Sequence, residues 1–264
     1  HYISASVIAG EREQMQRDDW YTTHRDGQRL ESPESVGRIA AERAVARLGG
    51  RKLKTGDYPV LFEAPLAAGL LGSLVHAASG GALYRKASFL LDHLGKQLMP
   101  DFVNIVERPH LPCGLASASF DSDGVATRDS DVVSAGVLQR YFLSAYTARK
   151  LGLQTTANAG GSHNLIIEPG SLDRAGLLQK MGRGLLLTEV LGHGINYVTG
   201  DYSRGAAGFW VEDGKIAYPV EEITIAGNLR DMFAGIVAVG NDVLARGSKQ
   251  SGSILIDRMT IAGE

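Results

Sequence analysis

Two runs of β-forming residues meet at the dipeptide Asp213-Gly214. Phe209 to Val211 lead into this pair, and Ile216 to Tyr218 lead out of it. Aspartate and glycine both tolerate the positive φ angles of a type I′ turn, whose twist matches that of two antiparallel strands. The pattern therefore predicts a tight β-hairpin. Pro219 has no N–H to donate to a ladder, so we expect the second strand to end there.

The hairpin belongs to a longer passage, Gly184 to Phe233. The passage begins with an apolar strand, Leu185 to Leu187, and continues through a glycine-rich polar segment and the hairpin to a short helix. It therefore combines residues suited to a core with residues suited to a site.

Hydrophobic periodicity and local start and stop signals divide the rest of the chain into strands and helices. The predicted strands are Tyr2–Gly10, Met15–Thr23, Val60–Phe62, Val103–Val106, Leu115–Phe120, Val132–Ser144 and Ser253–Ile261. One predicted helix starts at Pro33, after the Ser32 N-cap, and ends at Gly49-Gly50; the others are Leu66–Ala78, Ser88–Gln97 and Leu172–Met181. Because consecutive strands adjoin and most helices come early, the pattern favours an α+β fold. We expect largely antiparallel sheets with a few packed helices, rather than alternating βαβ units.

Charge and composition argue against two classes of partner. The chain carries 27 Lys and Arg against 29 Asp and Glu, so there is no basic excess to attract nucleic acid. An uncharged run from Ala64 to Tyr84 is interrupted by glycines and polar residues, with a break at Gly80-Gly81, so we expect a buried helix there and no membrane span. The single cysteine, Cys113, cannot form an internal disulfide. This cysteine usage suits a reducing cytosol, and we expect a cytoplasmic protein.

Four long motifs point to one protein family. They are TGDYSRGAAGFWVEDGKIAYPVEEITIAGNL (Thr199–Leu229), YRKASFLLDHLGKQL (Tyr84–Leu98), FDSDGVATRDSDVV (Phe120–Val133) and YTARKLGL (Tyr146–Leu153). These motifs resemble those of the PmbA/TldE proteins, partner subunits of the TldD metalloprotease, and the resemblance extends through nearly the whole chain. Family members are longer at the N-terminus, and this chain begins at His1. We therefore expect a C-terminal portion with a TldD/PmbA-like C-terminal fold, from which the N-terminal domain is absent.

Within that portion we expect two parts. Residues 1–100 hold the N-terminal strand pair and several helices, including the helix that corresponds to the family's metal motif. Residues 101–264 form a β-rich part. The family was historically named for an effect on DNA gyrase, but the charge balance gives no support to direct DNA binding.

The resemblance implies a specific test for metal chemistry. Catalytic TldD-type subunits carry H-E-x-x-x-H on a helix and a cysteine ligand near the C-terminus, a donor set suited to zinc. The corresponding positions here are Gly72, Ser73, Ala77 and Ser251. None of these residues supplies the family's ligands, so we expect no metal in this chain. His76 lies one position out of register, about 100° away around a helix, and we interpret it as a core or interface histidine.

A second segment, Thr188 to Gly194, looks like a zinc motif with its first histidine replaced. We regard this likeness as coincidental, although Glu189 and His193 could approach one another. Two ligands rarely hold zinc without a third. An unusual metal site assembled from Glu189, His193, His163 or Cys113 nevertheless stays open as an alternative, with His110 and Cys113 the one close His/Cys pair.

Two glycine-rich polar segments are candidates for a peptide groove. Gly160 to Asn164 and Gly200 to Gly205 combine backbone freedom, hydrogen-bond donors and an aromatic side chain. The candidate residues are His163, Asn164, His193, Tyr202 and Arg204. The alternative is that these segments are only turns with a structural salt bridge.

The resemblance implies a function, and two alternatives stay open beside it. It implies a non-catalytic, metal-less subunit of a cytosolic TldD/TldE-type metalloprotease. A TldD-like partner would supply the zinc and hydrolyse short unstructured peptides, as in microcin maturation and antitoxin degradation. The first alternative is an active metallopeptidase with a non-standard metal site. The second is a homodimeric peptide-binding module.

Overall fold

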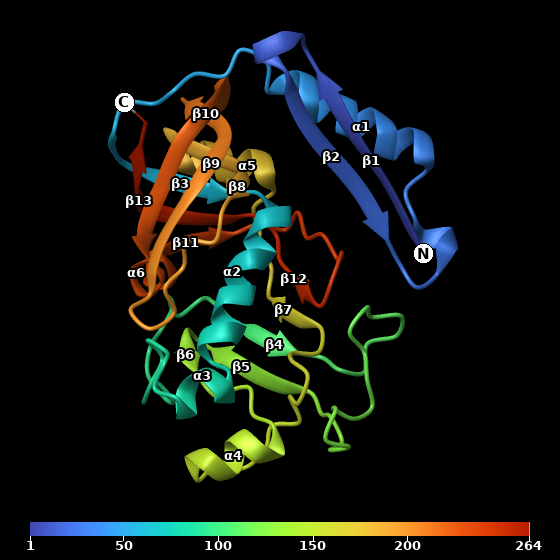
Figure 1. The fold of residues 1–264 in the computed structure, drawn as a ribbon, viewed down its shortest axis with the longest axis vertical. Coiled ribbons are helices and arrows are strands. Elements are labelled where there is room, and N and C mark those ends of the chain that lie inside the picture. The colour runs from blue at the N-terminus through green and yellow to red at the C-terminus, as the bar shows by residue number, and fades with distance from the viewer. Residues whose placement is uncertain (264) are drawn as a thin grey trace.

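The computed structural model describes residues 1–263. Its N-terminal part is a two-stranded hairpin with a helix packed on it, made of β1 (Tyr2–Ala9), β2 (Gln16–Thr23) and α1 (Pro33–Ala46). Short 3-10 turns, Arg12–Gln14 and Gly27–Arg29, follow the two strands. The Ser32 hydroxyl accepts a hydrogen bond from the Ser35 N–H, and Pro33 opens α1, so the predicted start of this helix is confirmed. In Figure 1 this unit lies to one side of the remaining chain.

The largest sheet has six strands in the order β10-β9-β8-β3-β13-β11. Their bounds are β3 Gly56–Phe62, β8 Gly184–Leu191, β9 Asp201–Glu212, β10 Lys215–Asn228, β11 Ile236–Val239 and β13 Ile254–Ala262. All neighbouring pairs are antiparallel except β3 and β8. β10 also pairs with β13, so five of the strands form a closed ring. β3 lies in this sheet with strands from the last third of the chain, and residue 100 therefore does not mark a structural boundary.

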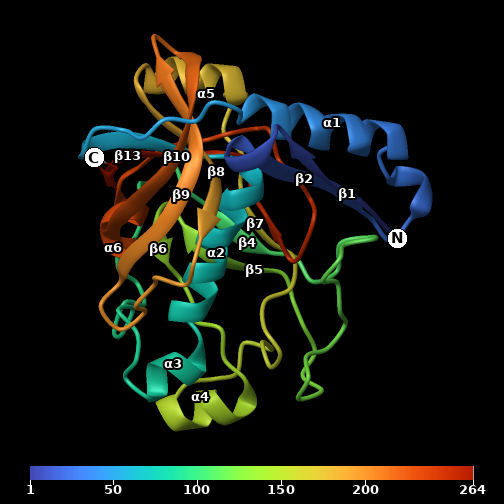
Figure 2. The same cartoon turned by 45° about the horizontal axis from the view of Figure 1, so that its top comes forward.

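A smaller five-stranded sheet lies at the other end of helix α2 (Ala64–Ala77). Its order is β12 (Lys249–Gln250), β7 (Leu165–Ile167), β4 (Ile105–Glu107), β5 (Ser130–Ser134) and β6 (Val137–Leu138). The other helices are α3 (Gly80–Tyr84), α4 (Ala145–Leu151), α5 (Arg174–Met181) and α6 (Leu229–Ala234). Figures 1 and 2 both show α2 running from the large sheet toward α3 and the smaller sheet. The predicted α+β fold with mostly antiparallel sheets is confirmed.

One hydrophobic core joins the two sheets through α2. Leu70, Leu74 and Ala77 of α2 belong to the same buried cluster as Phe62 on one side and Ile105 on the other. Among the described residues, neither hydrophobic cluster contains a member from residues 1–48. The N-terminal unit is therefore attached mainly by polar contacts. No helix in residues 1–263 has the length and apolar character needed to cross a membrane.

The predicted hairpin forms, but its second strand is longer than expected. Asp213 and Gly214 have φ angles of 50° and 70°, as a type I′ turn requires. The predicted strand end at Pro219 is wrong, because β10 continues to Asn228. At this point the outer neighbour is the segment at Arg51, whose N–H donates to the Pro219 carbonyl at 3.0 Å. Proline keeps its carbonyl, so it can sit in a strand where only an acceptor is needed.

The predicted helix Ser88–Gln97 is wrong, since this segment is a series of turns. The Ser88 hydroxyl donates to the Ala77 carbonyl at 2.5 Å and accepts the Leu90 N–H at 3.0 Å. Asp92 and Gly95 have positive φ angles, which a helix cannot contain. Phe89 and Leu90 are buried in the core. Tertiary contacts therefore override the helical periodicity of this segment.

Two further local predictions are wrong: the strand predicted for residues 115–120 and the break predicted at Gly80-Gly81. The predicted strand Leu115–Phe120 is made of turns, which Asn164 holds through its Oδ1 atom by accepting the Ala116 N–H at 3.0 Å. A short helix, α3, starts at the Gly80-Gly81 pair, where we expected a break, because the Ser79 hydroxyl caps it by accepting the Ala82 N–H at 3.3 Å.

A close approach between β8 and β9 gives a first prediction. A Cβ atom at Gly208 would lie 2.0 Å from the Leu186 carbonyl oxygen. We expect Gly208→Ala to lower the free energy of unfolding by about 1–3 kcal/mol, because the backbone of β8 must move to admit the methyl group. Gly37→Ala in α1 is the control, since a Cβ atom at this position would meet nothing within 4 Å. This control should be neutral or stabilising by up to about 1 kcal/mol. Urea unfolding of both variants measures the difference, and equal stabilities would contradict the prediction.

Candidate functional site

Three of the four positions that the sequence comparison matched to the family's metal motif lie on α2, and the fourth, Ser251, lies between β12 and β13; none of them offers a ligand to a metal. Ala77 has 0% exposure and is part of the core. The Ser73 hydroxyl is bound within the helix, donating to the Gly69 carbonyl at 3.2 Å. Ser251 is fully buried, and its hydroxyl donates to the Gly252 carbonyl at 2.6 Å. Ala77 therefore acts as a packing residue of the core.

A lysine covers the remaining position of the motif. A Cβ atom at Gly72 would lie 3.8 Å from Cε of Lys249, which β12 places against α2. The four compared positions therefore hold a glycine, two bonded hydroxyls and a core methyl group, with a cation beside the glycine, and these groups do not fit a metal ion. Within residues 1–263 no group of three or more His, Cys, Asp or Glu side chains is placed to hold a metal.

The other histidines and the cysteine of the metal alternatives lie apart. Glu189 forms an ion pair with Arg47. His193 is exposed in the loop after β8, and His110 contacts the Thr127 hydroxyl at 3.0 Å. Cys113 is exposed. His76, which we expected in the core or an interface, is exposed at the surface of α2, and its ring stacks on Tyr197 at 3.9 Å between centroids.

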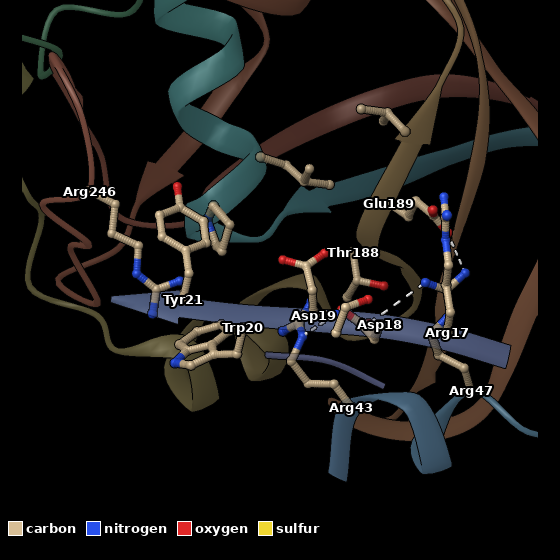
Figure 3. A pocket seen from close by; sticks show the side chains of 14 residues that line it. Arg17, Asp18, Asp19, Trp20, Tyr21, Arg43, Arg47, Thr188, Glu189 and Arg246 are labelled. Atoms are coloured by element: carbon tan, nitrogen blue, oxygen red, sulfur yellow. Dashed lines mark hydrogen bonds and ion pairs between the residues drawn. The ribbon is translucent and has the colours of Figure 1, made fainter. Parts of the chain in front are cut away.

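Three hollows adjoin one another around the N-terminal half of α2. The first, about 400 Å³, lies between β2, α1, α2 and β8 (Figure 3). A second hollow of about 360 Å³ lies between α2 and residues 244–249. A third, about 140 Å³, lies between α2 and β8–β9. Pro65 lines all three, so together they form one grooved surface, which we name the α2 groove.

The free edge of β2 borders the α2 groove. His1 and His24 exchange both backbone hydrogen bonds, at 2.9 and 3.1 Å. Because bonded and non-bonded pairs alternate along an antiparallel ladder, the backbone N–H and C=O groups of Arg17, Asp19 and Tyr21 point away from β1. The Asp19 N–H donates to the Asp18 carboxylate at 2.8 Å, so the groups of Arg17 and Tyr21 are the ones that a neighbouring strand would use. Five consecutive residues, 17–21, line the first hollow. Successive side chains of a strand point to opposite faces, so this hollow lies along the strand's edge.

Ion pairs hold β2 and α1 beside this hollow. Arg43 donates from Nε to Asp18 at 3.1 Å and from Nη1 to both carboxylate oxygens of Glu63, at 3.0 and 3.1 Å (Figure 3 shows the Asp18 contact). Burial disfavours the charge on Arg43, but Glu63 and Asp18 outweigh this, and the pKa of Arg43 is raised. Arg47 pairs with Asp18 and Glu189. These contacts link the N-terminal unit to α2 and β8.

The second hollow is cationic. Arg246 and Lys249 line it, together with Tyr21 and the small residues of α2. The Arg246 guanidinium stacks over the rings of Trp20 and Tyr21, at 3.7 and 4.9 Å from their centroids, and pairs with Glu31 at 3.3 Å (Figure 3 shows the stacking). Lys249 is half-buried, and burial lowers the pKa of its ammonium group.

The structure places Tyr202 and Arg204 in the third hollow, with Ser73 on its opposite wall. Tyr202 is buried, and burial raises the pKa of its hydroxyl while nearby Arg204 acts in the other direction. Arg204 donates to the Gly192 carbonyl at 2.7 Å, which ties it to the loop that carries His193. These three groove candidates therefore share one region.

The other two groove candidates lie elsewhere, beside the small sheet. The His163 N–H donates to buried Glu107 at 2.6 Å. The Asn164 side chain is fully buried and donates to the Arg108 carbonyl at 2.9 Å and to Ser117 at 2.8 Å. These contacts have a structural character, and neither residue lines the α2 groove described above.

Sequence reasoning missed the edge of β2 and Lys249. The β-propensity of residues 16–23 predicted the strand but gave no sign that one edge would stay open. Lys249 stands only two residues before Ser251, the position compared with the family's cysteine. That proximity is the signal that could have drawn attention to it.

Comparisons with known proteins agree with this architecture. The model of the PmbA/TldA metallopeptidase C-terminal domain matches residues 55–263, and that of the central domain matches residues 1–48. Metalloprotease PmbA of Escherichia coli O157:H7 is 52% identical over 264 residues, which is 100% of this chain and 59% of that protein. A Haemophilus influenzae homologue is 50% identical, covering 99% of this chain and 58% of its own length. The chain thus spans about three fifths of the curated relatives it matches.

Solved structures show the same fold. A Thermotoga maritima protein described as a suggested modulator of a DNA gyrase superposes with a TM-score of 0.92 at 36% identity, covering 99% of this chain and 62% of that one. TldE of Thermococcus kodakarensis has a TM-score of 0.86 at 22% identity, covering 99% and 62%, which shows the fold alone. From the matches to its central and C-terminal domains, this chain belongs to the PmbA/TldA metallopeptidase family.

Proposed function

We propose that this chain is the non-catalytic, metal-less subunit of a cytosolic TldD/TldE-type metalloprotease. A TldD-like partner supplies the zinc and cleaves short unstructured peptides. This chain contributes a peptide-binding surface. Its own polypeptide performs no hydrolysis.

The observation that carries the proposal is the state of the metal-motif positions on α2. Ala77 is packed in the core, and the Lys249 stem covers Gly72. A single substitution that supplied one ligand would therefore not recreate a metal site, because position 77 faces away from solvent and position 72 faces a cation. A family member that kept hydrolytic activity would need the opposite arrangement, with donor side chains converging on an open metal position.

The α2 groove supports peptide binding by strand addition. The outward N–H and C=O groups of Arg17 and Tyr21 can pair with an extended peptide main chain, while the hollows receive alternate side chains. Main-chain hydrogen bonds give affinity with limited demand on sequence. This suits a surface that serves unstructured peptides of varied composition.

The proposal is tested by metal analysis and peptide hydrolysis. We expect the chain purified alone to hold zinc well below one ion per molecule and to leave unstructured peptides uncleaved. The chain and a TldD-like protein should co-purify, and the pair should cleave peptides in a chelator-sensitive reaction. Stoichiometric zinc in the chain alone, with cleavage that a chelator abolishes, would instead favour an active metallopeptidase. A stable homodimer that does not bind a TldD-like protein would favour an independent binding module.

A further inference from the structure

The second hollow, which we now call the Lys249 hollow, carries an uncompensated positive charge. Arg246 and Lys249 are its charged lining residues, and the described lining contains no carboxylate. Arg246 is already paired with Glu31 and fixed by stacking on Trp20. Lys249 contacts the Ser248 hydroxyl at 3.4 Å, a long and weak partner for an ammonium group. This hollow therefore offers one available positive charge in a half-buried setting, where water screens it less than at an open surface.

The walls of the hollow favour a small ligand group. They consist of Ala64, Pro65, Ala68, Gly69 and Gly72 from α2, with Leu244 and Gly247 opposite. Nothing lies within 4 Å of a Cβ position at Gly69, so the helix surface is open there. A volume of about 360 Å³ accommodates the last one or two residues of a peptide with small side chains.

The hollow continues the free edge of β2. Tyr21, Pro65 and Arg246 line both this hollow and the larger one along β2. A peptide that runs along residues 17–21 in the same direction as β2 therefore reaches the Lys249 hollow with its C-terminal end. The direction matters, because a peptide of opposite polarity would bring its N-terminal ammonium group to Lys249, and the two positive charges would repel.

We propose that the Lys249 hollow binds the C-terminal carboxylate of the peptide paired with β2. The Lys249 ammonium donates to the terminal carboxylate, and the adjoining α2 surface receives the last side chain. The inference rests on the proposed peptide-binding function and adds polarity and substrate class to it: the chain holds the free C-terminal end of short peptides. A monoanion matches the single available charge better than a dianion such as phosphate.

Paired peptides provide the test. The probe is a six-residue peptide of alternating threonine and alanine with an N-terminal fluorophore, made once with a free carboxylate and once as the C-terminal amide. Fluorescence anisotropy with the wild-type chain should show about tenfold tighter binding of the acid, the effect of one charge-assisted hydrogen bond. Lys249→Met keeps the length of the side chain and removes the charge. It should bind both peptides with the affinity that the wild type has for the amide.

Two controls make the outcome specific. Lys215→Met removes one charge at the exposed start of β10, outside the hollow, and should keep the preference for the acid. Acetate should compete selectively with the acid peptide, whereas inorganic phosphate at equal ionic strength should compete no better. Lys249→Met should unfold at the same temperature as wild type or higher, since it relieves the burial of a charge.

The outcomes separate this inference from the function on which it rests. Equal binding of acid and amide by the wild type would overturn the carboxylate site and leave peptide binding standing. A preference for the acid that survives in Lys249→Met would place the carboxylate elsewhere and also overturn the assignment. If neither peptide binds, the proposed peptide-binding surface and this site fall together.

Discussion

Replacing Glu63 by glutamine should lower the free energy of unfolding by about 3 kcal/mol. Glu63 is 4% exposed. Both oxygens of its carboxylate accept hydrogen bonds from Arg43, and the carboxylate also forms an ion pair with Arg174 at 3.2 Å. An amide of the same shape leaves the charge of Arg43 partly uncompensated in a buried setting. Removal of one partner of a buried ion pair costs roughly 3–5 kcal/mol. We expect a loss near the lower end of this energy range, because Arg43 keeps its ion pair with Asp18.

Thermal unfolding and limited proteolysis measure this effect. At about 2–4 °C per kcal/mol for a chain of this size, the melting temperature should fall by roughly 6–12 °C. Residues 1–48 should also become sensitive to protease, because ion pairs rather than a shared hydrophobic core attach this unit to α2 and β8. The orientation of the β2 edge relative to the α2 groove depends on the same contacts.

A matched surface pair controls for the loss of one carboxylate. Glu42 pairs with Arg38 at 3.0 Å, but both side chains are more than half exposed. Glu42→Gln should change stability by less than about 0.5 kcal/mol. The double variant Glu63→Gln with Arg43→Met should recover part of the loss, because it removes the uncompensated charge. Equal effects of Glu63→Gln and Glu42→Gln, or no recovery in the double variant, would contradict the account.

Much of the fold follows from residues that act on their near neighbours. Ser32 and Pro33 fix the start of α1, and Asp213-Gly214 fixes the hairpin of β9 and β10. Such signals operate within a few residues, so they survive in any tertiary context. The strands Val60–Phe62 and Leu185–Leu187 were also visible as apolar runs. Their parallel pairing was not, because partners so far apart in the chain leave no local trace.

The failed predictions have the same physical origin. The segment 88–97 has helical periodicity, yet Ser88 bonds to Ala77 and the Tyr141 hydroxyl accepts the His93 N–H at 2.9 Å. These contacts come from distant parts of the chain and outweigh a weak local preference. At Pro219 the local rule assumed that both backbone groups are needed, whereas the Arg51 segment uses only the carbonyl.

The candidate site also combines features that the sequence reveals with features that depend on tertiary packing. Three of the positions compared with the metal motif could be located because they occupy one helix, and their lack of ligands follows from residue type. The sequence did not reveal that Ala77 lies in the core or that Lys249 covers Gly72. Both features depend on how β12 and the core pack against α2. The open edge of β2 likewise depends on tertiary structure, because among the described strands β2 pairs with β1 alone. The sequence thus identifies residue types that are unsuited to a metal more readily than it identifies the side chains that pack around them.

Alternate N-methylation of a bound peptide should reveal strand addition at β2. In an extended peptide every second N–H faces the neighbouring strand. We expect methylation of two amides in one phase to weaken binding by about 100-fold, and in the other phase by less than about threefold. Each blocked amide leaves an outward carbonyl of β2 unpaired, at about 1–3 kcal/mol, and 1.4 kcal/mol corresponds to tenfold. Fluorescence anisotropy with the threonine–alanine peptide measures both phases.

Substitution of Arg17 in β2 tests the same backbone contact from the protein's side. The N–H of Arg17 points away from β1, so Arg17→Pro removes a donor to the peptide without removing a bond between β1 and β2. We expect about tenfold weaker binding by Arg17→Pro. Arg17→Ala loses the same side chain but keeps the N–H, and should bind more tightly than the proline variant. If both methylation phases weaken binding equally, or if the proline and alanine variants bind alike, the peptide lies elsewhere than along the edge of β2.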